Sequence, residues 1–166
     1  MPELRDTKVR FTVDGQSYEL STQVELVIDR DDLDCEMGKQ AALFAWYGVM
    51  RERARYERML KEAEIEELEA QIEDDLRMRL DDKKMMDGRK MTEDAISSKI
   101  RVDPRLSIAR RQLRKTDQNE KMLDMFVSAM AQRKDMLVAL ARSRHLEMSA
   151  PSADEVDRIK KNLHLG

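Results

Sequence analysis

The chain of 166 residues has one cysteine, three prolines and five glycines, and only 4% of its residues are aromatic. With Cys35 alone, no disulfide can form within the chain and no metal site can be built on several cysteines. A single thiol also suits a reducing cytosol. A globular core of this length would use more aromatic and turn residues, so we expect long helices that pack on partner helices.

The sequence also lacks the signals of membrane proteins and of common enzymes. No apolar run approaches the roughly 18 residues of a membrane helix, and the first residues lack the basic-then-apolar pattern of a secretion signal. Two histidines are too few for a His-based site, and no glycine-rich phosphate loop is present. The acid pairs Asp74-Asp75 and Asp81-Asp82 could hold Mg²⁺, but adjacent residues on a helix face different ways. We therefore expect no enzymatic activity, no cofactor and no metal.

What the chain has in abundance is charge, at 39% of residues, and its distribution is uneven. Residues 83–115 contain eleven Lys/Arg and four acids, which gives +7. Residues 1–50 have ten acids and five bases, and residues 51–82 have twelve acids and seven bases, so each carries −5. Residues 116–166 balance at eight against eight. The local field of the basic segment, and not the net charge of −3, decides whether a polyanion is attracted.

The first elements expected are two short strands on either side of Asp14-Gly15. The apolar residues that alternate with polar ones there are Val9, Phe11, Val13, Tyr18 and Leu20. An Asp-Gly pair in this setting predicts a two-residue hairpin turn with positive φ at both residues. A lone hairpin is marginally stable, so it must lie on its own helices or add to a neighbour's sheet. Residues 24–28 are either a further strand or the approach to a helix.

A first long helix is expected to begin between residues 31 and 38 and to run from about 39 to about 80. Its first part, 41–50, is apolar almost all round and must be buried on several sides. Trp46 and Tyr47 could stack on bases, but an aromatic cluster at helical spacing is more often core. Beyond Arg51 a narrow seam for one partner helix follows: Leu60, Ile65, Leu68, Ile72, Leu76 and Leu80.

A second long helix is expected after a break at residues 83–91, which contain Asp87-Gly88. Thr92 can cap a short helix over 93–101, and Asp103-Pro104 supplies the N-cap and first position of a helix to about 148. Its apolar stripe is Leu106, Ala109, Leu113, Leu123, Phe126, Val127, Met130, Leu137, Leu140 and Ala141. Pro151 ends this helix, and Ser152-x-x-Glu155 is a capping box for a terminal helix to about residue 163.

These patterns predict a mainly α protein, a long antiparallel helical hairpin with a small N-terminal β-hairpin. The broadly apolar sections 41–50 and 122–140 can meet only if the helices are antiparallel. We divide the chain into residues 1–30 (strands), 31–148 (helical hairpin core) and 149–166 (tail). Surplus apolar surface requires other copies of the chain. The residues expected to support this homo-oligomer are Leu43, Phe44, Trp46, Tyr47, Leu123, Phe126, Val127, Met130, Leu137 and Leu140.

The basic segment is the candidate functional site. Basic runs are most often solvated surface, but this one is gathered at one end of the predicted hairpin, is rich in arginine and contains no base-reading scaffold. Such arginines favour contact with phosphates over readout of sequence. The candidates for DNA contact are Lys83, Lys84, Arg89, Lys90, Lys99, Arg101, Arg110, Arg111 and Arg114, with Lys115 beside them. Repeated around an oligomer, a weak patch becomes a continuous track.

The order of these parts resembles the UvsY-like recombination mediators of T-even phages. The match begins with the apolar aromatic helix (43–50) and continues to L-R-M-R-L-D at residues 76–81. The family has a similar L-[KR]-x-R-L-D, whose two basic residues contribute to single-stranded DNA binding; carried over, these are Arg77 and Arg79. Both chains then resume, after a loop with glycine, with a helix whose apolar second half supports oligomerisation in the family.

The resemblance covers about residues 31–148, and the chain departs from the family in its hairpin and its terminal helix. It implies a closed ring of like subunits, six to eight by resemblance, that binds single-stranded DNA. It further implies that a RecA-class recombinase is loaded in place of single-strand-binding protein, in the cytoplasm of an infected bacterial host. The residues alone support only a helical oligomer that contacts a polyanion.

Two other functions remain open from the sequence. A phage structural or tail-assembly coiled-coil protein would use the basic segment to pair with acidic faces of neighbours. A regulator that binds double-stranded DNA is a further alternative, although no compact helix-turn-helix stands out. Within the motif, Arg77 and Arg79 diverge by about 200° on a helix. One of them is therefore expected to face DNA while the other pairs with Glu73 or Asp75.

Overall fold

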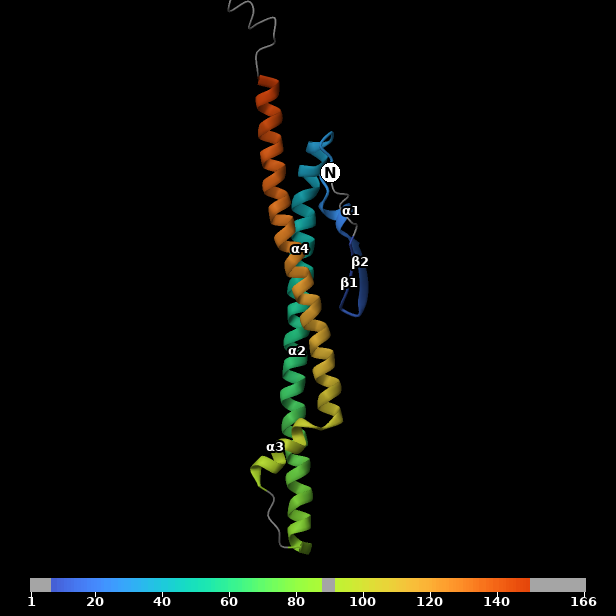
Figure 1. Ribbon diagram of the computed structural model, residues 1–166, viewed down its shortest axis with the longest axis vertical. Coiled ribbons are helices and arrows are strands. Elements are labelled where there is room, and N and C mark those ends of the chain that lie inside the picture. Colours follow the sequence, from blue (N-terminus) through green and yellow to red (C-terminus); the bar gives the residue numbers. More distant parts are fainter. Residues whose placement is uncertain (1–6, 88–91, 150–166) are drawn as a thin grey trace, which may run out of the picture.

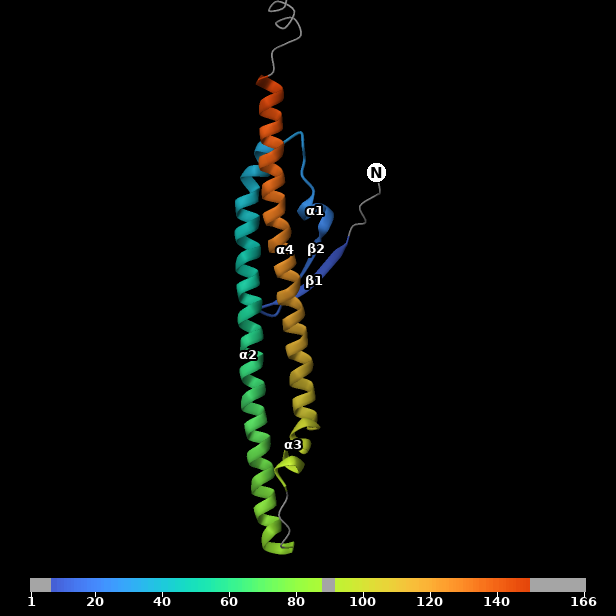
Figure 2. The same ribbon diagram turned by 60° about the vertical axis from the view of Figure 1, so that its left-hand side comes forward.

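Two long antiparallel helices form the body of the protein in the computed structural model (Figures 1 and 2). The structure describes residues 7–87 and 92–149, with side chains for 7–79 and 92–149. Helix α2 (Leu33–Asp87) packs along α4 (Pro104–Ser149), and the short α3 (Glu93–Arg101) lies beside the second half of α2. The predicted mainly helical class, with a small N-terminal sheet, is confirmed. In the part described, no helix is long and apolar enough to cross a bilayer.

The predicted β-hairpin consists of β1 (Lys8–Val13) and β2 (Gln16–Ser21), paired antiparallel. Asp14 and Gly15 have φ values of 53° and 72°, as a two-residue turn with the twist of the strands requires. Phe11 and Val13 are buried against the long helices. Asn119 on α4 donates a hydrogen bond of 2.7 Å to the carbonyl of Thr12. The hairpin therefore lies on the helices of its own chain.

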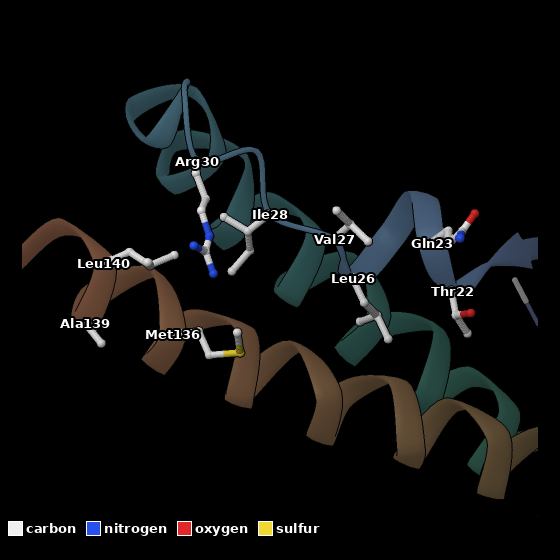
Figure 3. Close-up of a pocket in the computed structure, with 9 residues that line it drawn as sticks. All are labelled: Thr22, Gln23, Leu26, Val27, Ile28, Arg30, Met136, Ala139 and Leu140. Carbon is white, nitrogen blue, oxygen red and sulfur yellow. The ribbon is translucent and has the colours of Figure 1, made fainter. Parts of the chain in front are cut away.

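The segment after the hairpin is helical, so the alternative of a further strand at residues 24–28 was wrong. Ser21 caps α1 (Thr22–Leu26) by accepting a hydrogen bond of 3.2 Å from the backbone N–H of Val24. This local cap favours a helical turn over an extended strand. Together with residues 27–30, α1 crosses α4 and borders an apolar hollow of about 550 Å³ (Figure 3). The hollow is lined by Thr22, Gln23, Leu26, Val27, Ile28, Arg30, Met136, Ala139 and Leu140.

Helix α2 begins at Leu33, inside the expected window, but it ends later than expected. It continues to Asp87, so the predicted break across residues 83–91 was wrong for its first five residues. No glycine or proline occurs between Leu80 and Gly88, and Lys and Met are good helix formers. Lys83 and Lys84 therefore belong to α2 and not to a loop.

The predicted caps of α3 and α4 are confirmed. The side chain of Thr92 accepts a hydrogen bond of 3.3 Å from the backbone N–H of Ala95. The Asp103 carboxylate accepts one of 2.8 Å from the backbone N–H of Arg105, and Pro104 is the first residue of α4. The terminal helix expected up to residue 163 lies outside the described residues.

The core is divided into two clusters along the hairpin. The larger contains Phe11, Val13, Tyr47, Met50, Ala54, Leu123, Phe126 and Met130. The smaller contains Ile65, Ile72 and Leu106, with Leu68, Leu76, Ile100, Ala109 and Leu113 packed around it. Leu60 was expected in the seam, but it is 45% exposed. Arg58 and Lys61, which are both half-buried, occupy the seam positions between Ala54 and Ile65 instead.

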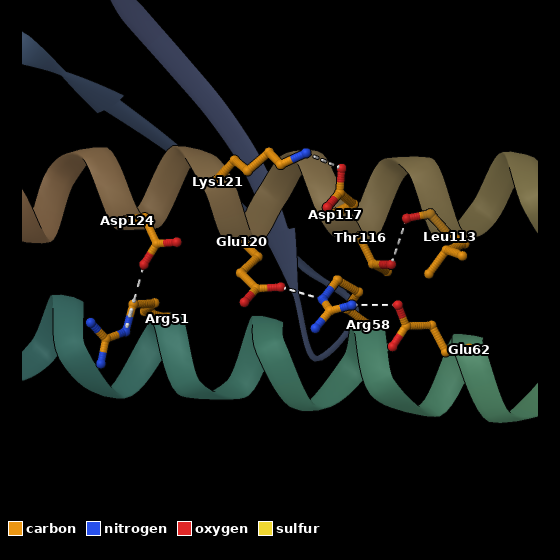
Figure 4. Close-up of polar contacts among 9 residues, drawn as sticks. All are labelled: Arg51, Arg58, Glu62, Leu113, Thr116, Asp117, Glu120, Lys121 and Asp124. Carbon is orange, nitrogen blue, oxygen red and sulfur yellow. Dashed lines mark hydrogen bonds and ion pairs between the residues drawn. The ribbon is translucent and has the colours of Figure 1, made fainter.

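Ion pairs between the helices lie beside the larger cluster and in the stretch between the two clusters (Figure 4). The Arg58 guanidinium on α2 lies 2.6 Å from the carboxylate of Glu120 on α4, and it also pairs with Glu62. The hydrogen bond to Glu120 raises the pKa of Arg58. Arg51 and Asp124 are 3.8 Å apart beside the larger cluster, two turns earlier on α2 and one turn later on α4. These pairs favour one register of the two helices.

One arginine is buried within the section of α4 that the sequence presents as apolar. Arg133 is 4% exposed and pairs with Glu36 and Gln40 at the start of α2. Gln40 in turn donates a hydrogen bond of 2.7 Å to the carbonyl of Met130, and Arg133 reaches the carbonyl of Val27. The cluster joins α2, α4 and the segment between α1 and α2.

Replacing Leu123 with alanine is expected to destabilise the fold by about 2–5 kcal/mol, because it leaves a cavity in the larger cluster. Met125, two residues away and 64% exposed, is the matched control, and Met125→Ala should change stability by about 0.5 kcal/mol or less. Urea unfolding followed by circular dichroism at one protein concentration measures both. Equal effects of the two variants would contradict this core.

The buried Arg133 cluster makes a second prediction. Arg133→Met should cost about 3–5 kcal/mol, because the nearly buried Glu36 carboxylate then keeps, among the described residues, only the exposed Lys39, 3.7 Å away, as an ion-pair partner. The double variant Arg133→Met/Glu36→Leu should be more stable than the single one, because no uncompensated charge remains. The same urea titration compares them. If the double variant is no more stable than Arg133→Met, the loss of stability does not come from breaking the pair of Arg133 with Glu36.

Candidate nucleic-acid interface

The basic segment is held against the second half of α2 by apolar contacts. Ile96 of α3 is 5% exposed, and Ile100 packs against the smaller cluster. The backbone N–H of Asp103 donates to the carbonyl of Ile100, which closes the turn from α3 into α4. This packing brings the cations of residues 93–115 next to the acidic residues of α2. We call this region, α3 with residues 104–115 of α4 and 69–79 of α2, the basic end.

Several cations of the basic end are already paired within the chain. Arg105 lies 3.4 Å from Asp75 and 3.2 Å from Asp103, and Arg110 lies 2.9 Å from Glu69. The side-chain hydrogen bond from Arg105 lowers the pKa of Asp103. These cations are thus neutralised in part by acids that lie about 30 to 40 residues earlier in the chain.

Arg77 joins α2 to α3. Its guanidinium lies 2.7 Å from Glu73, one turn earlier on α2, and 3.0 Å from Glu93 at the start of α3. The hydrogen bond to Glu73 raises the pKa of Arg77 most, and the hydrogen bond to Glu93 raises it further. Pairing of one motif arginine with Glu73 or Asp75 was expected, and Arg77 does pair with Glu73. Arg79 is exposed and forms no ion pair with another described residue.

A second group of cations is exposed and forms no ion pair within the described part of the chain. Its members are Arg79, Lys99, Arg101, Arg111, Arg114 and Lys115. Arg111, Arg114 and Lys115 are spaced by three and four residues, so they share one face of α4. Leu106, Ala109 and Leu113 face α2 and are wholly or half buried. We call Arg111, Arg114 and Lys115 the cation strip.

The other predicted DNA contacts cannot be placed in this way. The side chains of Lys83 and Lys84 are outside the described ones, and Arg89 and Lys90 lie outside the described residues altogether. Lys115 was noted only as a neighbour of the predicted contacts. Its spacing from Arg111, one helical turn, was the signal that it belongs with them.

The residues that were expected to form contacts between copies of the chain fall into three groups. Tyr47, Leu123, Phe126, Met130 and Leu137 are buried within the chain itself. Substitutions there would act on the fold before acting on any contact between copies. The second group is half-buried and consists of Leu43, Val127 and Leu140.

Phe44 and Trp46 form the third group, with 43% and 37% of their surface exposed. Trp46 packs edge-on against Tyr18 and Tyr47, with ring centroids 5.9 Å and 4.9 Å away. Val49 is 51% exposed as well. The burial of residues 41–50 on several sides is therefore not supplied by the described part of the chain, because the β-hairpin and α4 leave part of this section open.

The acid pairs considered for a metal have other surroundings. Asp75 is paired with Arg105 and Asp74 is exposed, while the side chains of Asp81 and Asp82 are outside the described ones. Among the described residues, no three His, Cys, Asp or Glu side chains gather as metal ligands would.

Comparison with protein-family models, curated proteins and solved structures finds no match for this chain. The chemistry of the basic end is therefore inferred from its own residues. Guanidinium and ammonium groups on one helix face can bind anions such as phosphates. No aromatic residue lies in α3 or in residues 104–115 to stack on a base.

The different surroundings of the two motif arginines lead to a test by hydrogen exchange. Arg77→Ala should speed amide exchange in residues 93–101 severalfold, because it removes the ion pair with Glu93 that ties α3 to α2. Arg79→Ala, which removes no ion pair among the described residues, is the control and should leave exchange in α3 unchanged. Mass spectrometry of peptic peptides measures both. Equal exchange in the two variants would show that Arg77 does not hold α3.

Proposed function

We propose that this protein is a non-enzymatic recombination mediator. As a homo-oligomeric ring it binds single-stranded DNA through the basic end and promotes loading of a RecA-class recombinase in place of single-strand-binding protein. The observation that carries the DNA-binding part is the set of exposed cations at the basic end that form no ion pair with another described residue, in a chain whose net charge is −3. The recombinase and the single-strand-binding protein come from the resemblance to UvsY-like mediators.

The cation strip is the best-supported contact for DNA. Its three side chains already point to solvent from one face, so a phosphate would not have to displace a carboxylate. Arg77, Arg105 and Arg110 would first have to leave their acidic partners. The absence of aromatic residues there favours contact with the backbone of the DNA over contact with its bases.

Assembly of several copies would raise the affinity of the cation strip for DNA. Three cations per chain support only weak binding, but copies held together engage one strand at high effective concentration. The exposed apolar residues of α2, among them Phe44 and Val49, supply a reason for the chain to associate.

The decisive experiment is fluorescence anisotropy of labelled oligo-dT at several salt concentrations. Affinity should fall linearly on a log–log scale with salt, by about 0.7 in slope for each phosphate contacted. Arg111→Ala/Arg114→Ala/Lys115→Ala should weaken binding and flatten the slope by about 2 for each engaged chain. Light scattering should show that this variant assembles as the parent does.

The matched control is Lys121→Ala/Arg142→Ala/Arg144→Ala, because it also removes three cations, all exposed on α4 outside the basic end. This control should bind like the parent. Absence of binding at low salt would refute the proposal. Equal losses in the control and in the strip variant would move the contact away from the strip.

A second candidate function is that of a phage structural or tail-assembly coiled-coil protein. The ion pairs of Arg105 and Arg110 with acids of α2 favour it, because the same pairing could occur between chains. In that case, oligo-dT would not bind, while self-association would weaken as salt is raised.

A further inference from the structure

Helix α2 carries a second apolar stripe, on the side facing away from α4. Its positions follow the alternating steps of three and four residues of a coiled-coil seam, with Glu52 as the one polar interruption. The apolar members are Ala42, Ala45, Val49, Tyr56, Met59 and Ala63, and all are exposed. Val49, Tyr56 and Met59 keep 51%, 62% and 54% of their surface in solvent. We call this set the outer stripe.

The outer stripe is distinct from the seam that packs on α4. Tyr47 and Ala54, which are fully buried, are each two residues from a stripe position, or about 200° around the helix. A regular row of exposed large apolar side chains opposite a filled seam is a surface that calls for a second partner.

The stripe also has the shape of a contact site. A hollow of about 590 Å³ lies over it, lined by Ala45, Gly48, Val49, Glu52 and Tyr56, with Arg51, Arg53 and Asp14 at its edge. The small residues Ala45 and Gly48 leave room for a side chain of another helix. The tip of the β-hairpin is fixed beside the hollow, because Arg53 pairs with Asp14 at 3.0 Å.

The charges along the second half of the stripe and just beyond it identify the partner and its direction. Residues 51–55 are basic, with Arg51, Arg53 and Arg55, and residues 62–67 are acidic, with Glu62, Glu64, Glu66 and Glu67. A second α2 placed parallel and in register would set like charges against each other. Placed antiparallel with Ala45 opposite Ala70, its acidic part lies along the basic part of the first copy, and Tyr56 of each copy lies opposite Met59 of the other. Arg55, Glu66 and Glu67 form no ion pair with another described residue, so they are available for this role.

We propose that a second copy of this chain packs its own α2 antiparallel on the outer stripe. The inference rests on the self-association included in the proposed function, and it is independent of DNA binding. An antiparallel pair of identical helices has two-fold symmetry. A ring built with such contacts therefore contains an even number of chains.

The first test is light scattering of Tyr56→Glu/Met59→Glu. These exposed side chains can be replaced without disturbing the core, which circular dichroism would verify, and the parent assembly should break into smaller species. The matched control is Met125→Glu/Met136→Glu on α4, whose methionines are 64% and 57% exposed. The control should assemble like the parent. A stripe variant that assembles like the control, or a monomeric parent, overturns the proposal.

The second test measures direction by spin-label distances in a Cys35→Ser background. Chains with Ala41→Cys are mixed with chains with Asp74→Cys, two exposed positions outside the outer stripe, and these two labels should be within about 20 Å across the pair. Labels at position 41 on both copies should be about 50 Å apart, from the rise of a helix over 33 residues. A short distance between the two 41 labels means a parallel pair and overturns the proposal.

Oligo-dT binding, measured on the same samples, separates this inference from the proposed function. Assembly through the stripe without DNA binding would leave the inference standing and refute the function. Parent-like assembly of the stripe variant, with salt-dependent DNA binding intact, would refute the inference alone.

Discussion

The stacking of Tyr47 on Phe126 is the contact on which the arrangement of the other elements depends. The rings are almost parallel, at 4°, with centroids 5.3 Å apart, and they join the centre of α2's first half to α4. Trp46 and Tyr18 extend the aromatic group to β2, where Tyr18 stacks on Phe11. Burial, together with the charge of Glu25, raises the pKa of Tyr47 and keeps its hydroxyl neutral. The few aromatic residues of the chain are therefore concentrated where a marginal hairpin needs an apolar surface to lie on.

The two ends of the helical hairpin formed by α2 and α4 are stabilised by different interactions. The end near the β-hairpin has the larger buried cluster and the buried Arg133 group, whereas the basic end has three buried side chains and a set of exposed ion pairs. Exposed ion pairs contribute little to stability and are screened by salt. Packing and binding are thus divided along the length of the molecule, and the residues proposed to contact DNA are not those that hold the fold together.

The features predicted well were those decided by neighbouring residues. The Asp14-Gly15 turn, the Thr92 cap and the start of α4 at Pro104 each follow from the chemistry of a few adjacent side chains. The end of α2 was missed because nothing between Lys83 and Asp87 stops a helix. Leu60 was misplaced because an amphipathic lysine, Lys61, fits the seam as well. For the site, the sequence located the cations but could not show which were paired, because Asp75 and Glu69 are 30 and 41 residues from their partners.

The small size of the smaller cluster affects how cooperatively the protein unfolds. Ile65, Ile72 and Leu106 bury far less apolar surface than the eight residues of the other cluster, so the basic end should open locally at a lower free energy than the whole fold. Helix α2 spans about 80 Å, so such a local opening leaves the end that contains Tyr47 and Phe126 intact. Any ligand that prefers the closed basic end would then shift this local equilibrium by mass action, with no rearrangement of the end that carries the β-hairpin.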